Sequence, residues 1–156
     1  MKFTYKRNIS DIVKNVQGLK NARLQVGWFE DSKYDDSTKI GEVAEWQEYG
    51  GEEFNVAYPP RPFMRPAQEN NQETWSKIMD KKIAEIVDKG GEVSEAMKIL
   101  GNVVKGDIQE AIIAVTTPPL AESTIKARQK RGNKSVKPLV DTGAMLASVS
   151  LEVEDV

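Results

Sequence analysis

The stretch that decides the fold is Ala57-Tyr58-Pro59-Pro60-Arg61-Pro62-Phe63-Met64-Arg65-Pro66. Its four prolines fix φ, remove backbone donors and push the residues before them towards extended geometry, so it forms neither a helix nor an inner strand. Large side chains stand between the prolines on a backbone with little freedom. We therefore expect an extended proline-rich arm, within residues 51–66, that presents a rigid contact surface.

The spacing of apolar residues on either side of the arm predicts helices and strands. Apolar residues three and four apart indicate helices, and alternating ones indicate strands. Before the arm this predicts a strand over 1–6, a helix over 10–19, a strand over 23–28 and a helix from Ser37 or Thr38 to the glycine stop at Gly50. After the arm it predicts helices over 67–89 (with Pro66 at the first helical position), 94–115 and 120–130, a basic loop over 130–138, a turn of helix over 143–148 and a closing strand over 149–153.

This order of elements indicates an α+β fold. Strands that are far apart in the sequence have to form one small, mostly antiparallel sheet, with the helices packed on one of its faces. The chain has 156 residues and a mass of 17.4 kDa, which is the size of one domain, so we expect residues 1–156 to share a single core.

The composition argues against most kinds of catalysis. The chain has no cysteine and no histidine, which excludes disulfides, thiolate or imidazole metal ligands, and any catalytic base built on those side chains. The longest apolar run, 111–115, is too short for a signal peptide or a membrane span. Any catalysis would have to rest on carboxylates, lysines or hydroxyls. We expect no metal, no cofactor and no membrane contact, and synthesis in the cytoplasm.

Charge is distributed unevenly along the chain. Between residues 30 and 53, nine acids stand against Lys33 and Lys39, a net charge of −7, whereas residues 126–137 carry six bases and no acid. Such a split is a signal for a partner. The basic stretch could lie in solvent, make non-specific contact with DNA phosphates, or face the acidic surface of a neighbouring subunit. We favour the last reading because it uses both charged segments.

Interface residues are expected in the arm, in the acidic segment 30–53 and in the basic stretch 126–137. Aromatic and arginine side chains on a rigid backbone are the usual anchors of interfaces. The candidates are Trp46, Tyr49, Arg61, Phe63, Arg65, Arg128, Lys130 and Arg131, with Gly50, Asp141 and Gly143 as structural turn or capping residues.

Three motifs carry a resemblance to a known family: Glu48-Tyr49-Gly50, then Pro60-Arg61-Pro62-Phe63-Met64-Arg65-Pro66-Ala67, and finally Lys137-Pro138-Leu139-Val140-Asp141-Thr142-Gly143-Ala144-Met145-Leu146-Ala147-Ser148. In residue identity, order and spacing they resemble the neck and tail-completion (virion morphogenesis, head-tail joining) proteins of tailed bacteriophages. The resemblance covers most of the chain from about residue 22 onwards. The resemblance implies a small non-enzymatic α+β subunit in the neck or tail of a virion. It also implies a homo-oligomeric ring of six subunits, with head-tail connector and tail proteins as partners.

Two functions of other classes are weighed against this one. A small DNA-binding accessory protein would use the basic stretch 126–137. The pI of 5.4 and the absence of a recognisable helix-turn-helix argue against a protein that recognises a specific DNA sequence. The segment 139–144 also looks like the active-site turn of the aspartic proteases. Only thirteen residues follow Gly143, too few for the flap and second loop of that family. We therefore expect Asp141 or Thr142 to cap the turn of helix over 143–148.

Overall fold

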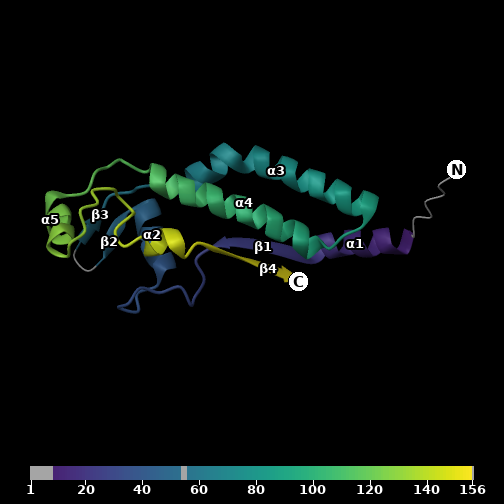
Figure 1. Cartoon of the computed structure of the whole chain (residues 1–156), viewed down its shortest axis with the longest axis horizontal. Helices are drawn as coiled ribbons and strands as arrows, with labels where there is room; N and C mark the ends of the chain where they lie inside the picture. The colour runs from purple at the N-terminus through teal and green to yellow at the C-terminus, as the bar shows by residue number, and fades with distance from the viewer. Residues whose placement is uncertain (1–8, 54–55, 156) are drawn as a thin grey trace.

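The computed structural model describes residues 9–53 and 56–155 (Figure 1). The strand expected over residues 1–6 lies outside this part of the chain. In chain order the described elements are α1 (Ile9–Asn21), β1 (Ala22–Gly27), α2 (Ile40–Tyr49), β2 (Gly51–Glu53), β3 (Val56–Tyr58), α3 (Met64–Lys89), α4 (Val93–Ala114), α5 (Glu122–Lys130), α6 (Ala144–Ala147) and β4 (Ser150–Asp155). The α+β class expected from the sequence is confirmed.

Two long helices form the length of the molecule. Helix α3 has 26 residues and α4 has 22, which at 1.5 Å per residue gives about 39 and 33 Å. The pair of glycines after Lys89 ends α3 and reverses the chain, with Gly90 at φ 81° and its N–H bonded to Ile86 O. The two helices then run side by side as an antiparallel hairpin (Figure 1).

The first and last described strands pair beneath α4. Strands β1 and β4 are antiparallel, with Leu24 opposite Val153 and Val26 opposite Leu151. Leu24 and Leu151 face Gly101 of α4, where an added Cβ would lie 2.9 and 3.1 Å from their Cδ atoms. The residues between them, such as Arg23 and Glu152, are exposed. The ribbon is therefore apolar on the face that α4 covers and polar on the other, as the alternation predicts.

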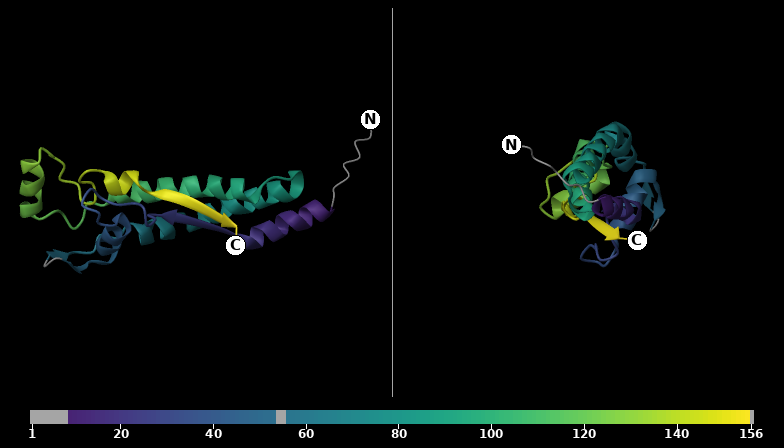
Figure 2. Two further views of the ribbon diagram at one scale, coloured as in Figure 1. Left: turned by 90° about the horizontal axis from the view of Figure 1, so that it is seen from below. Right: turned by 90° about the vertical axis from the view of Figure 1, so that its right-hand side faces the viewer.

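The remaining elements gather at one end of the molecule. Strands β2 and β3 form a second antiparallel pair, with Glu52 opposite Ala57, and they lie near α2 and α5 (Figure 1). Helix α1 leads from β1 towards the opposite end, so the N-terminal end of α1 is far from α2 and α5 in Figure 1 and in the left view of Figure 2. The subunit is consequently elongated.

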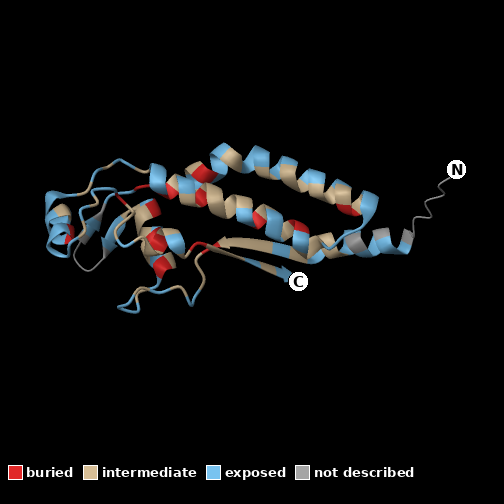
Figure 3. Ribbon diagram, in the orientation of Figure 1, coloured by how far each residue is buried: buried red, intermediate tan, exposed pale blue. Residues whose placement is uncertain are grey.

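The core lies where the arm meets the helices. Phe63 is 1% exposed and packs edge-on against Trp28, with 5.9 Å between ring centroids. Trp28 Nε1 donates to Met145 O at 2.9 Å, which ties β1 to α6. Buried residues concentrate in this region and thin out along the helical hairpin (Figure 3). The core cluster is Ile40, Ala44, Phe63, Ala67, Ile108, Ile112, Met145 and Val149.

Two helix starts differ from the expectation. Helix α2 begins at Ile40 because Ser37 adopts a left-handed φ of 70° and the Thr38 N–H bonds to the side chain of Asp36, so neither Ser37 nor Thr38 caps it. Helix α3 begins at Met64, so Pro66 is its third residue and not its first. Helix α3 starts earlier than expected because a carboxylate of α2 accepts hydrogen bonds from its first N–H groups.

Candidate functional site

Glu48 of α2 caps α3 from outside that helix. Its carboxylate accepts hydrogen bonds from the backbone N–H groups of Phe63, Met64 and Arg65, at 2.6, 2.9 and 3.2 Å. The Arg65 side chain adds a bond from Nε at 2.9 Å. Pro66 follows and has no N–H, so every donor at the start of α3 up to this residue is satisfied. The negative charge also lies at the positive end of the helix dipole.

These bonds keep Glu48 ionised although it is buried. Only 3% of the residue is exposed. Burial alone would raise the pKa of its carboxyl, but the hydrogen bonds from Phe63, Arg65 and Met64 outweigh it and hold the pKa below its ordinary value. Glu48 therefore fixes the angle between α2 and α3, at the point where the arm ends.

Arg61 binds the arm to two other parts of the chain. Its Nε and Nη2 donate to Pro118 O and Pro119 O at 2.8 and 3.0 Å, in the turn after α4. Its Nη1 and backbone N–H donate to Gln47 Oε1 and Gln47 O, at 3.3 and 2.6 Å. Burial and the nearby Arg128 lower the pKa of this guanidinium. The arm is thus fastened by its arginine and not held out as a free surface.

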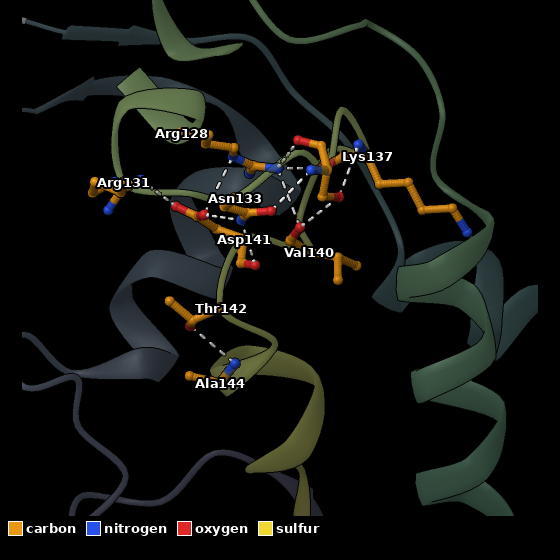
Figure 4. Close-up of polar contacts among 9 residues, drawn as sticks. Arg128, Arg131, Asn133, Lys137, Val140, Asp141, Thr142 and Ala144 are labelled. Carbon is orange, nitrogen blue, oxygen red and sulfur yellow. Dashed lines mark hydrogen bonds and ion pairs between the residues drawn. The ribbon is translucent and has the colours of Figure 1, made fainter. Parts of the chain in front are cut away.

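Arg128 organises the basic loop in the same manner (Figure 4). From α5 its Nη1 donates to Ser135 O, Lys137 O and Val140 O, at 3.3, 2.8 and 3.1 Å. Its Nε lies 3.5 Å from Asp141 Oδ1. Residues 131–140 have no helix or strand, so this arginine supplies the contacts that regular structure would otherwise provide.

Asp141 closes the loop from the other side, which corrects its expected role as a helix cap. Its carboxylate accepts from Asn133 Nδ2 at 2.7 Å and from Arg131 Nη2 at 2.8 Å. Helix α6 starts instead at Gly143, and the Ala144 N–H bonds to Thr142 Oγ1 at 3.2 Å (Figure 4). Burial alone would raise the pKa of Asp141, but the hydrogen bonds from Asn133 and Arg131 have the larger effect, so the pKa lies below its ordinary value.

Burial also corrects part of the expected interface. Phe63, Arg61 and Arg128 are 1%, 6% and 5% exposed, so these three side chains serve the subunit's own fold and have almost no surface for a partner. Their large or charged side chains suggested an interface from the sequence, but hydrogen bonds to carbonyl groups and a ring contact hold them inside.

The other candidates stay accessible to different degrees. Tyr49 is 62% exposed, with Arg65 over its ring at 4.9 Å. Lys130 and Arg131 are exposed, and Trp46 is half-buried. Gly50 and Gly143 have φ of 73° and 82°, in the left-handed region that favours glycine.

A groove of 960 Å³ lies between these anchoring networks. Its walls come from the loop 33–36, from α2, from the arm at Arg61, from α5 at Arg128 and Arg131, and from Asp141. Burial, followed by the charges of Asp141 and Asp36, raises the pKa of Tyr34 on this wall. The acidic segment 30–53 and the basic loop 130–138 of one subunit therefore border the same groove. The sequence did not indicate this proximity.

The described residues contain no group of three or more acidic side chains placed to hold a metal ion. Among the helices of the described ranges, none has the length and apolar character needed to cross a membrane. No protein-family model, curated protein or solved structure matches the chain.

Proposed function

We propose that this chain is a structural assembly protein that forms a ring at the head-tail joint or tail end of a phage or prophage virion. The three motifs that resemble the neck and tail-completion proteins meet at one end of the subunit. Glu48 of the first binds the second, at Met64 and Arg65, and Arg128 holds the third at Lys137 and Val140. An end built in this way offers a fixed shape to neighbouring copies.

The elongated shape leaves a large accessible surface for contacts with neighbouring copies. It is 10689 Å², whereas a compact monomer of 17.4 kDa has about 7,900 Å². The eleven residues outside the described ranges, even if fully exposed, would account for about 2,100 Å² of this difference of about 2,800 Å². The rest follows from the elongated shape, which exposes more of the helices and strands than a compact monomer would.

Ring closure requires two unlike surfaces on each subunit, because a repeated rotation brings one against the other. The exposed bases Lys126, Lys130, Lys134 and Lys137 lie on α5 and its loop, and the exposed acids Glu42 and Glu45 lie on α2. Contact between these surfaces of adjacent subunits would set the register and the rate of assembly more than the affinity.

The mass and symmetry of the purified particle test this function. We expect light scattering to give a multiple of 17.4 kDa, six subunits being what the resemblance implies, and electron microscopy to show a ring. Addition of duplex DNA is the control for the alternative. A monomer at all concentrations that binds duplex DNA in a salt-sensitive manner would instead assign the basic loop to a DNA-binding accessory protein.

A further inference from the structure

The free edge of β1 opens into an apolar groove. In the described part of the chain β1 pairs with β4 only, along one edge. Residues Gln25, Val26 and Gly27, at the end of β1, line a groove of 430 Å³ together with residues of α2 and the start of α3. Main-chain donors and acceptors of an edge strand therefore stand beside apolar walls.

The walls of this groove are aromatic and its rim is acidic. Trp28, Phe29 and Met64 are half-buried in it, and Tyr49 is mostly exposed. Glu45 lies exposed on the rim, and Glu30 and Asp31, which directly follow Phe29, are exposed too. An edge strand next to apolar pockets is the arrangement that accepts an added β-strand, whose alternate side chains enter the pockets.

We propose that residues 1–6 of a neighbouring copy of this chain bind here and extend the β1–β4 sheet by one strand. In that sequence Met1, Phe3 and Tyr5 alternate with Lys2, Thr4 and Lys6. The alternation gives three apolar side chains to one face and two lysines to the other, which matches aromatic walls beside acidic side chains. The inference rests on the self-assembly proposed above and names the segment that links adjacent subunits.

The segment has to come from another copy because its own subunit places it too far away. Thirteen residues of α1 span about 20 Å and the first three residues of β1 about 10 Å more, and both lead away from the groove (Figure 2). Eight residues in fully extended form reach at most about 29 Å. Residues 1–6 of the same subunit would be used up in the return and could not lie along the edge.

Disulfide trapping tests the contact, because the chain has no cysteine of its own. Full-length Tyr5→Cys and Glu45→Cys, on chains with tags of different size, are mixed, allowed to exchange and oxidised. Since each chain then has one thiol, every disulfide joins two subunits. We expect a mixed dimer at least about fivefold above that of the control pair Tyr5→Cys with Gln72→Cys, an exposed site on α3. Equal yields for the two pairs would overturn the proposal.

A peptide gives a second readout that does not depend on ring formation. The acceptor is the full chain with Phe3→Asp and Tyr5→Asp, which keeps the groove but removes its own ligand, and the probe is a labelled peptide of residues 1–8. We expect binding at least about tenfold tighter than that of a peptide with the same composition and no alternation, a difference of about 1.4 kcal/mol. Glu45→Lys in the acceptor should weaken it about two- to fivefold at low salt.

The outcomes separate this inference from the proposed function. Rings that form without the mixed disulfide, with no peptide binding below about 1 mM, would overturn the inference and leave the ring subunit standing. Peptide binding and disulfide trapping in a protein that never closes a ring would support the strand addition and overturn the proposed function. Absence of both contacts and assembly would overturn both.

Discussion

Three buried charges, Glu48, Arg61 and Arg128, each bind main-chain groups that have no hydrogen-bond partner within a helix or a strand. Glu48 binds N–H groups, and the two arginines bind carbonyls. A buried charge that loses such partners costs more than the bonds contribute when made, because the groups left behind are unsatisfied away from water. At these positions we therefore expect conservative changes to be costly.

Glu48→Gln should lower stability and remove part of its dependence on acid. The pKa of Glu48 is depressed in the folded protein, so the unfolded state binds more protons once the pH falls below the ordinary value near 4.5, and stability declines as the pH falls further. In urea titrations the wild type should lose unfolding free energy over this acidic range, and Glu48→Gln should lose less of it. Glu48→Ala at pH 7 should cost at least about 2 kcal/mol. The exposed neighbour Glu45→Gln is the control, and an equal effect there would contradict the capping role.

Arg128→Lys should loosen the basic loop. A lysine keeps the charge but cannot offer the planar set of donors that reaches Ser135, Lys137 and Val140 together. We expect trypsin to cleave after Lys134 at least about tenfold faster in this variant, which corresponds to about 1.4 kcal/mol of easier opening. Lys130→Arg, on the exposed side of the same helix, should leave that rate unchanged. Unchanged cleavage in Arg128→Lys would show that other contacts hold the loop.

At the scale of elements, local patterns in the sequence predicted most of the fold. The helix expected over 94–115 is α4 at Val93–Ala114, and the strands expected over 23–28 and 149–153 are β1 and β4, because three-four spacing and alternation reflect burial on one face. The contacts of the three buried charged side chains could not be predicted in this way. Glu48 counted as one acid of a charged segment and as part of a motif, but no capping role was assigned to it, since its partners lie fifteen or more residues ahead. One signal was present: Phe63 cannot cap a helix, so the cap had to come from elsewhere.

The same limit explains the errors at the arm and the loop. Pro-rich and Lys/Arg-rich segments favour exposed surfaces on average, and the sequence has no periodicity there to show which side chains turn inward. Arg61 and Phe63 turn inward because the carbonyls of Pro118 and Pro119 and the ring of Trp28 receive them. These partners are brought together only by the tertiary structure. The sequence therefore could not show which of the candidate interface residues are buried within the subunit.

Two glycines of α4 give a matched test of how the helix packs on the ribbon. An added Cβ at Gly106 meets nothing within 4 Å, so Gly106→Ala should stabilise the protein by about 1 kcal/mol through helix propensity. At Gly101 the Cβ would press on Leu24 and Leu151, so Gly101→Ala should forfeit that gain, and Gly101→Val should cost about 1 to 3 kcal/mol. Thermal melts of the three variants at one concentration check this. Equal stabilisation by both alanines would mean that the ribbon does not pack closely on α4.

At the scale of the whole molecule, a small core and a long shape make assembly a source of stability. The core cluster lies at one end, whereas the helical hairpin continues with few fully buried residues (Figure 3). A subunit of this kind gains from any partner that binds only the folded form, by an amount that grows with concentration. The charges at the two proposed contact surfaces then decide how that gain responds to salt, because exposed pairs are screened over about 8 to 10 Å at ordinary ionic strength.

Charge reversal on the basic loop should therefore weaken assembly at low salt and leave the isolated subunit intact. Lys130→Glu with Lys134→Glu changes exposed residues that do not belong to the Arg128 and Asp141 network, so the subunit should fold as before. The melting temperature of the wild type should rise with protein concentration, and this rise should shrink in the double variant at low salt and recover in part when Glu42→Lys is added. Lys81→Glu with Lys98→Glu, on the helical hairpin, makes the same change in net charge and is the control. If both pairs weaken assembly equally, net charge and not a specific surface is responsible; if neither does, apolar contacts alone close the ring and the basic loop serves another partner.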